Sequence, residues 1–313
     1  VLVSMSNAMG FWLACLLPTV SAVSLGLAAE SALRNNEVQA NYSSGAAIAV
    51  SQNKGRNRGE DVVVTPGSNG IFNVTLLMDG HGGQSIMKRA VNLQKELLET
   101  CKSFGDWPRC ASDAFKQFQE NARMMRYRGG ATVVALVMEE ASKKAAFAWA
   151  GDSMGILVKQ GTMAFRTSTH TAESGAELQR IRDHRPPYEY RLDDGYLCGL
   201  RRQGCVMPTR GLGDVDLESA GFLAVPETSD FMAMEEGDFV LMASDGLWDV
   251  LSEEDVLLHA KVGSWQANVA TSEKLAKIAV QQWLQLYGRP SEADDVSVVI
   301  FQPGPVIPAR AEL

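Results

Sequence analysis

Residues 239–252 read FVLMASDGLWDVLS, an apolar run that ends at Asp245. Short apolar runs bounded by turn residues predict buried strands. The same design recurs at three other places: 72–78 before Asp79, 145–150 before Gly151-Asp152, and 296–301 after Asp294-Asp295. A β-branched run at 131–138 adds another strand. The sequence therefore predicts at least five strands, several of which carry a carboxylate at one tip.

Apolar residues at helical spacing predict helices between these strands. The expected helices cover 84–101, 112–125, a segment that Ser252 opens, and a last segment that Ser272 caps and Gly288 ends. Residues 182–209 show no sustained periodicity and read as a long loop. Strands occur in both halves without an internal repeat, which favours one α+β domain.

The two ends of the 313-residue chain differ in composition from its centre. Residues 1–29 hold no charged side chain, and the stretch 8–29 is about long enough to cross a bilayer, so a targeting or anchor segment and a buried extension both remain open. We expect a polar linker at 30–44, a folded domain at 45–303 and a short tail at 304–313. Membrane association is expected only through 1–29. The glycosylation sequon at Asn73 falls in a predicted core strand, which favours a domain that faces the cytosol.

Charge and cysteine content exclude several function classes. The 29 Lys and Arg residues against 37 Asp and Glu residues give a net charge of -8, so no overall basic field exists to bind nucleic acid. The five cysteines contain no C-x-x-C pair, which speaks against structural zinc. Cys101, Cys110, Cys198 and Cys205 could be free thiols or form two disulfides.

Acidic residues beside predicted strands or glycine turns form the candidate site: Glu60, Asp61, Asp79, Asp152, Asp245, Asp294 and Asp295. Each alone is typical of a turn. If they converge at one end of a sheet, their mutual repulsion and desolvation require cations. Oxygen donors without a thiolate cluster or paired histidines favour Mg²⁺ or Mn²⁺. Two such ions about 4 Å apart can share a water molecule and lower its pKa.

Seven motifs in this order resemble the metal-dependent protein phosphatases of the PPM, or type 2C, family. They are Lys54-Gly55-Arg56 with Glu60-Asp61, LLMDGHGG at 76–83, RGGATVVAL at 128–136, WAGDS at 149–153, TRGLGD at 209–214, FVLMASDGLWDVLS at 239–252, and ADDVSVVIF at 293–301. The resemblance covers about 46–302. It implies a two-sheet antiparallel β-sandwich flanked by α-helices on both faces, with the metal site at one end of the sandwich.

The resemblance also implies a role for each matching residue. Asp79 would bridge two metal ions, and the carbonyl of Gly80 would bind one of them. Asp245 and Asp294 would complete the other ion's ligands. Glu60 would hold a metal directly or through water, Asp61 and Asp295 would support the ligands from behind, and Asp152 with Asp245 would hold a third, weaker ion. Arg56 would bind the substrate phosphate, and His81 would protonate the departing Ser or Thr oxygen.

Other interpretations stay open for some of these residues. His81 could merely close a tight turn, and Arg56 could belong to a solvated basic run with Lys54 and Arg58. Trp248 is expected to pack in the core, and Arg210 to order the site indirectly. The sequence departs from the family pattern at Met154 in place of Arg, at 169–172, at Thr209-Arg210-Gly211 and at Asp294-Asp295.

The sequence thus predicts a Mg²⁺- or Mn²⁺-dependent phosphatase that acts on phosphoserine and phosphothreonine in proteins. Two alternatives remain: a catalytically weak pseudophosphatase that binds phosphoproteins, and a phosphohydrolase for small molecules. The departures from the family pattern favour the first alternative slightly, whereas intact Asp79, Asp245 and Asp294 oppose it. The substrate protein, the preferred ion and the oligomeric state do not follow from the sequence.

Overall fold

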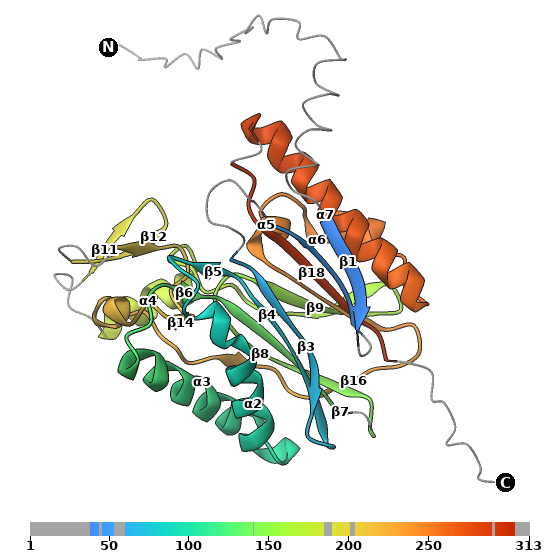
Figure 1. Ribbon diagram of the computed structural model, residues 1–313, viewed down its shortest axis with the longest axis horizontal. Helices are drawn as coiled ribbons and strands as arrows, with labels where there is room; N and C mark the ends of the chain where they lie inside the picture. Colours follow the sequence, from blue (N-terminus) through green and yellow to red (C-terminus); the bar gives the residue numbers. More distant parts are fainter. Residues whose placement is uncertain are drawn as a thin grey trace, which may run out of the picture.

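Two antiparallel sheets stack face to face in the centre of the molecule, and helices cover both outer faces (Figure 1). The computed structural model describes residues 38–43, 46–52, 60–139, 141–184, 190–200, 204–289 and 292–303. The predicted terminal segments 1–29 and 304–313 lie outside the described residues. This arrangement confirms the predicted α+β sandwich with helices on both sides.

The first sheet joins the two ends of the described chain. Its strands lie in the order β1 (Val38–Ser43), β2 (Ala46–Ser51), β18 (Val296–Phe301), β17 (Phe239–Ala243), β9 (Met154–Lys159) and β10 (Thr162–Arg166). The strands predicted at 239–244 and 296–301 are confirmed. The linker predicted for 30–44 is wrong in its last part, because Val38–Ser43 pair with β2 along their whole length. Backbone hydrogen bonds to a neighbouring strand hold this polar stretch in the sheet.

The second sheet has the order β15 (Glu227–Thr228), β8 (Lys144–Ala150), β7 (Val133–Glu139), β4 (Phe72–Met78) and β3 (Val62–Ser68), and β16 (Met232–Ala233) pairs with β8. Alternate side chains of β4 enter two different cores. Leu77 packs between the sheets with Phe147 and Val240, whereas Leu76 packs under the helices. Strands buried on both faces read as continuous apolar runs, which is why these could be recognised in the sequence.

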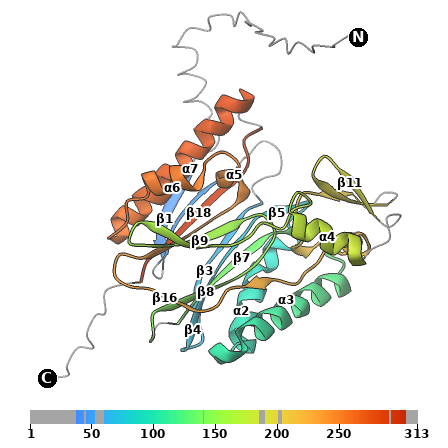
Figure 2. The same ribbon diagram turned by 180° about the vertical axis from the view of Figure 1, so that it is seen from behind.

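Different helices cover the two outer faces (Figure 2). Helices α2 (Ala90–Thr100) and α3 (Trp107–Met124) pack on the second sheet around a core that includes Leu93 and Phe115. Helices α5 (Asp245–Trp248), α6 (Glu253–His259) and α7 (Trp265–Tyr287) pack on the first sheet through residues such as Leu275. None of the helices in the described ranges is long and apolar enough to span a membrane.

Helix boundaries agree with the sequence prediction in part. Ser252 caps α6 through a capping box with Asp255, and Gly288 ends α7 in the left-handed conformation. The cap predicted at Ser272 is wrong. Ser264 caps α7, and Ser272 is buried inside that helix, where its hydroxyl donates to the carbonyl of Val269. Helices α2 and α3 begin at Ala90 and Trp107, six residues later and five residues earlier than predicted.

The segment 182–209, predicted as a loop, contains strands that the sequence did not reveal. Strands β11 (Tyr190–Asp193), β12 (Tyr196–Gly199) and β13 (Cys205–Val206) form a small sheet next to α4 (Gly175–His184), and we call residues 190–200 and 204–207 the flap. Strands β11 and β12 meet at Asp194-Gly195, where both residues have a positive φ, as a tight hairpin requires. The strands are too short to show periodicity.

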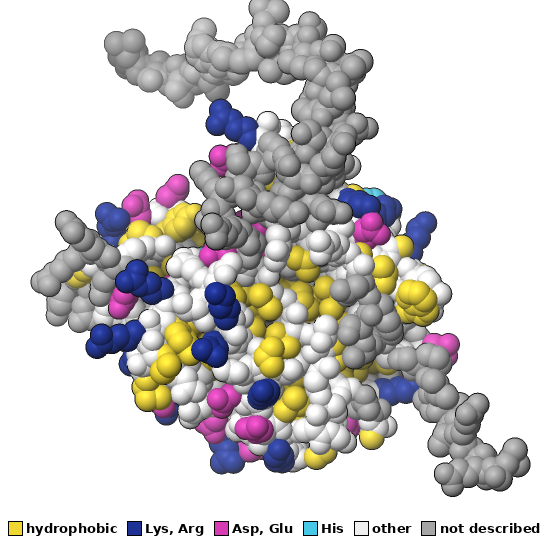
Figure 3. Space-filling view, viewed as in Figure 1, with side chains coloured by type: hydrophobic (Ala, Val, Ile, Leu, Met, Phe, Trp, Pro, Cys, Tyr) yellow, Lys and Arg dark blue, Asp and Glu magenta, His cyan; other side chains and the backbone are white. Residues whose placement is uncertain are grey.

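The four cysteines outside 1–29 form two disulfides, Cys101–Cys110 and Cys198–Cys205. The alternative of free thiols is therefore wrong. Cys101 and Cys110 are buried beside α2 and α3, whereas Cys198–Cys205 joins opposite residues of β12 and β13 in the flap. On the face shown in Figure 3, basic and acidic side chains are interspersed among uncharged ones.

Candidate active site

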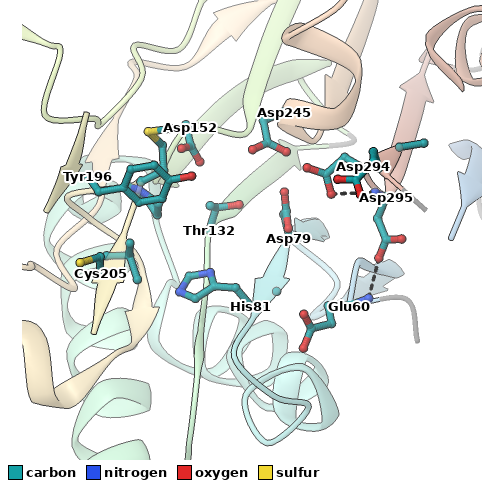
Figure 4. Close-up of a pocket in the computed structure, with 16 residues that line it drawn as sticks. Glu60, Asp79, His81, Thr132, Asp152, Tyr196, Cys205, Asp245, Asp294 and Asp295 are labelled. Carbon is teal, nitrogen blue, oxygen red and sulfur yellow. Dashed lines mark hydrogen bonds between the residues drawn. The ribbon is translucent and has the colours of Figure 1, made fainter. Parts of the chain in front are cut away.

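A pocket of about 360 Å³ opens at one end of the sandwich, where loops from both sheets meet. Seven acidic residues line it: Glu60, Asp79, Asp152, Asp245, Glu292, Asp294 and Asp295. In Figure 4 the carboxyl groups of Asp79, Asp245 and Asp294 turn toward one another, with His81 beside them. The structure therefore brings together residues that are as far as 235 positions apart in the chain.

Asp79 and Asp245 lie at the tips of strands from different sheets. Asp79 follows β4, and its carbonyl accepts a hydrogen bond of 2.8 Å from the amide of Thr132. Asp245 begins α5 directly after β17. Burial, followed by the charges of Asp61 and Asp245, raises the pKa of Asp79 well above its ordinary value. The two carboxyl groups thus repel each other in the absence of a cation.

The close approach of α5 to the start of β18 depends on a glycine. A Cβ atom at Gly246 would lie 2.0 Å from the carbonyl oxygen of Asp295, which no side chain permits. The indole of Trp283 in α7 donates to the carbonyl of Gly246 at 2.7 Å and fixes α5 from behind. This contact keeps Asp245 next to Asp294 and Asp295.

Asp294 and Asp295 precede β18 and differ in their surroundings. Asp295 is buried, and its Oδ2 accepts from the amides of Glu60 at 2.6 Å and Asp61 at 3.4 Å. It therefore ties the start of β18 to the segment that leads into β3. Asp294 lies at the exposed rim, yet desolvation of its carboxyl group and the charge of Asp245 raise its pKa to about 7.

Glu60 and Asp61 directly precede β3. Glu60 lines the pocket, and its Oε1 accepts from the amide of Gly83 at 3.0 Å. Asp61 is 2% exposed, and the hydroxyl groups of Ser297 and Ser244 near its carboxyl group act to lower its pKa. Burial and the charge of Asp295 raise the pKa of Asp61 to about 8.

Asp152 occupies the turn between β8 and β9. Burial and the charge of Asp245 raise its pKa to about 8. The turn is held by His170, whose Nδ1 accepts from the amide of Gly151 at 3.2 Å and whose ring stacks on Trp149 at 6.4 Å between centroids. His170 thus places a buried imidazole under the Asp152 turn.

The donor set fits hard divalent cations. A buried carboxyl oxygen of Asp245 lacks a hydrogen-bond partner within the described ranges, and several pKa values are raised because burial and neighbouring negative charges disfavour ionisation in one pocket. Oxygen ligands of this kind suit Mg²⁺ and Mn²⁺. In the same ranges, no three Asp, Glu, His or Cys side chains already converge tightly on one point. The carboxylates surround the pocket and do not form a closed cage.

His81 lies at the side of the pocket, in β5 (Gly80–His81). Its Nε2 lies 2.5 Å from Oδ2 of Asp214. The sequence alone assigned no role to Asp214. Burial lowers the pKa of His81, but the hydrogen bond and charge of Asp214 outweigh that effect, and the pKa is raised. Only the position of Asp214 in the TRGLGD motif could have drawn attention to it.

Two other expectations concern residues around the pocket. Trp248 is half-buried, and its indole donates to the carbonyls of Ala243 and Met154, so it anchors α5 on the sheet as predicted. Arg210 pairs at 2.6 Å with buried Glu177 in α4, and neither residue lines the pocket. The predicted phosphate ligand Arg56, with Lys54 and Arg58, lies outside the described residues.

Comparison with known proteins identifies the family. The family model described as Protein phosphatase 2C matches residues 53–282, which is most of the chain. The chain belongs to the protein phosphatase 2C family. This finding confirms the resemblance on which the sequence analysis rests.

Relatives within the protein phosphatase 2C family are distant. Probable protein phosphatase 2C 33 of Arabidopsis thaliana is 34% identical over 128 residues, which cover 40% of this chain and 25% of the relative. Probable protein phosphatase 2C 30 of the same plant is 28% identical over 241 residues, which cover 72% of this chain and 57% of the relative. The chain thus spans between a quarter and three fifths of the length of these relatives.

Solved structures of similar proteins share the fold. The serine-threonine phosphatase 2C of Toxoplasma gondii matches with a TM-score of 0.58 and 13% identity, over 85% of this chain and 94% of that one. The Mycobacterium tuberculosis phosphatase PstP matches with a TM-score of 0.52 and 18% identity, over 82% and 96%. The catalytic domain of PstP is also known in complex with two manganese ions.

Acid should destabilise the protein through His170. Burial and the charge of Arg210 lower the pKa of this histidine to about 4, so the folded state keeps it neutral while the unfolded chain binds a proton below about 6.5. The unfolding free energy contributed by His170 is therefore present above pH 6.5 and is lost as the pH falls toward 4.

We expect that the fall in the unfolding free energy between pH 6.5 and pH 4 is smaller in His170→Asn than in wild type by about 1–3 kcal/mol. Urea unfolding of both proteins in EDTA, between pH 4 and pH 8, measures the difference. The raised pKa values of the pocket carboxyls act in the opposite direction, but they are common to both proteins and cancel in the comparison. If the unfolding free energies of wild type and variant changed with pH in parallel, the lowered pKa of His170 would be contradicted.

Proposed function

We propose that this chain is a serine/threonine protein phosphatase that uses two divalent cations, Mg²⁺ or Mn²⁺. The observation that carries the proposal is the pocket in which the half-buried carboxyl groups of Asp79 and Asp245 face Asp294 without a cationic partner among the described residues. Such a site is costly to fold unless it binds cations. Membership of the protein phosphatase 2C family supports the same conclusion.

Each acidic residue predicted from the sequence has a part in this proposal. Asp79, the carbonyl of Gly80, Asp245, Asp294 and Glu60 would hold the two ions, with Asp61 and Asp295 supporting them. Asp152 would hold a third, weaker ion together with Asp245. When bound, the ions supply an activated water molecule and neutralise the phosphate. Arg56, from the sequence alone, would bind the phosphate.

His81 would supply the proton that the departing serine or threonine oxygen needs. Its imidazole is half-buried at the side of the pocket, and the nearby carboxylates favour its protonated form. A positioned acid of this kind contributes about 100-fold or more to the rate when the leaving oxygen is a poor leaving group. The alcohol of a phosphorylated protein side chain is such a group.

The surroundings of the pocket favour a polypeptide over a small phosphorylated metabolite. A second cavity of about 750 Å³ adjoins the pocket and shares Asp152, Asp245 and Asp294 with it. Exposed Tyr196 and Met207 of the flap line both cavities, and Trp283 and Tyr287 of α7 line the second. Residues on either side of a phosphorylated side chain could occupy this continuous groove. No feature of the described pocket favours the pseudophosphatase alternative.

Phosphate release tests the proposal directly. The full chain is incubated with a phosphothreonine peptide or with a free sugar phosphate, in Mn²⁺, in Mg²⁺ and in EDTA. We expect metal-dependent release from the peptide, at least about 100-fold lower in Asp245→Asn and unchanged in Asp113→Asn, which alters an exposed acid of α3. Release from the sugar phosphate alone would identify a small-molecule phosphohydrolase. No release by folded protein would leave the pseudophosphatase.

A further inference from the structure

His81 and Asp214 come from a small sheet that lies beside the pocket. Strand β6 (Gly130–Ala131) pairs with β5 on one side and with β14 (Leu212–Gly213) on the other. His81 and Gly213 are both opposite Gly130, so Asp214 follows directly after the partner position of His81. The result is the 2.5 Å contact between Nε2 of His81 and Oδ2 of Asp214.

We propose that Asp214 is a positioning residue that holds the imidazole of His81 in the orientation needed to deliver a proton to the leaving oxygen. This inference rests on the proposed function of His81. Asp214 is not among the residues that line the pocket, and its side chain is 10% exposed. It therefore acts through the histidine.

The backbone around Asp214 is held in an uncommon conformation. Asp214 has φ 41° and ψ 39°, in the left-handed region, which costs a non-glycine residue about 1 kcal/mol or more. Its amide donates to the carbonyl of Gly129 at 3.0 Å, and its carbonyl accepts from Leu217 at 2.8 Å. Such a conformation persists only when its surroundings determine it.

Helix α3 fixes the preceding residue from the other side. The side chain of Gln119 donates to the carbonyl of Gly213 at 2.7 Å and accepts from the amide of Gly213 at 2.8 Å. Gln119 is buried and also donates to Glu218, which pairs with Arg123. The turn that carries Asp214 is thus attached to the helix by two hydrogen bonds to the backbone of one residue, Gly213.

The strand between the two residues leaves room for their contact. A Cβ atom at Gly130 would lie 2.1 Å from Oδ2 of Asp214 and 2.9 Å from Nε2 of His81. Any other residue at 130 would therefore push the carboxylate and the ring apart. A glycine at this position is what the His81–Asp214 pair requires.

The contact decides which imidazole nitrogen can serve the substrate. Because Asp214 engages Nε2, the ring presents Nδ1 as the nitrogen available for the leaving oxygen. A ring fixed in one orientation avoids the loss of rate that follows when a catalytic group is misplaced by about 1 Å. Asp214 would thus select both the orientation of the ring and the nitrogen that donates.

Two substitutions separate the side chain from the backbone. Asp214→Gly removes the carboxylate and tolerates the positive φ. Asp214→Asn keeps an oxygen that can accept from Nε2–H and also tolerates this conformation. Asp216→Asn, which alters an exposed acid two residues away, is the matched control. Thermal unfolding verifies that all three variants fold.

Two substrates with different leaving groups provide the readout. A phosphothreonine peptide needs a proton on its leaving oxygen, whereas an aryl phosphate releases a stabilised phenolate. With Mn²⁺, we expect Asp214→Gly to lower kcat on the peptide about 100-fold and kcat on the aryl phosphate less than about 3-fold. KM should stay unchanged, Asp214→Asn should recover at least about 10-fold of the lost rate, and Asp216→Asn should match wild type.

Three results would overturn the role of Asp214: equal losses on both substrates, no loss on either, or no recovery in Asp214→Asn. Nitrogen NMR of the histidine rings in metal-free protein gives an independent measurement, with the His81 signals assigned by their loss in His81→Gln. We expect a protonated Nε2 whose signal changes in Asp214→Gly, and an unchanged signal would also overturn the role. No turnover by wild type on either substrate would instead refute the proposed function.

Discussion

Asp79→Asn is expected to stabilise the metal-free protein and to abolish its metal-dependent activity. Asp79 is surrounded by Asp61, Asp245 and Asp294, and burial with these charges raises its pKa well above the usual range. A carboxyl group whose pKa is raised in the folded state lowers stability at any pH above its unfolded value, so near pH 8 the neutral amide removes that cost. We expect a gain of about 1–2 kcal/mol in EDTA.

The same substitution removes the residue proposed to bridge the two metal ions. Phosphate release from a phosphothreonine peptide in Mn²⁺ should fall at least about 100-fold, and Mn²⁺ should no longer raise the melting temperature by the wild-type amount. As the pH falls below the unfolded pKa of 3.8, the carboxyl becomes neutral in both states and the stability gain should disappear. A variant that loses stability in EDTA at pH 8, or that keeps its response to Mn²⁺, would contradict this account of Asp79.

Glu177→Gln should cause the largest loss of stability outside the pocket. Glu177 in α4 is 2% exposed, and its carboxylate accepts from Thr209, Arg180 and Arg210. Burial alone would raise its pKa, but the hydrogen bonds from Arg210, Arg180 and Thr209 prevail and lower the pKa to about 2. Removing the charge takes away the nearest anionic partner of two partly buried guanidinium groups, which costs about 3 kcal/mol.

Urea unfolding of wild type and Glu177→Gln near pH 7 measures this loss. The contribution of Glu177 is fully present above its unfolded pKa of 4.5 and is lost as the pH falls toward 2, so the two proteins should converge only as the pH approaches 2. The matched control is Glu173→Gln, a nearby exposed carboxylate, which should change stability by less than about 0.5 kcal/mol. A loss for Glu177→Gln that is no larger than the control's would refute the assigned network.

The central strands could be predicted because each is buried on both faces. Residues 72–78 and 296–301 are apolar almost throughout, and their predicted limits agree with β4 and β18. Strand β1 and the flap strands could not be predicted in this way. Val38–Ser43 has mixed polarity and owes its conformation to pairing with β2, and β13 has only two residues. Pairing partners distant in sequence are not visible in local composition.

The candidate site was predictable in its residues but not in its connections. Asp79, Asp245 and Asp294 stand out because each adjoins an apolar strand, and the structure places them around one pocket. The contact of Asp214 with His81 joins residues 133 positions apart, and Asp214 precedes no long apolar run. Likewise, nothing near His170 in the sequence indicates that it supports the turn at Gly151.

The central claim is that the carboxylates of the pocket hold metal ions. Isothermal titration calorimetry of the full chain with Mn²⁺ near pH 7.5 tests this claim. We expect wild type to bind about two ions and Asp245→Asn to bind them at least about 10-fold more weakly, with Asp113→Asn equal to wild type. Folded wild-type protein that binds no Mn²⁺, or binding that Asp245→Asn leaves unchanged, would contradict the claim.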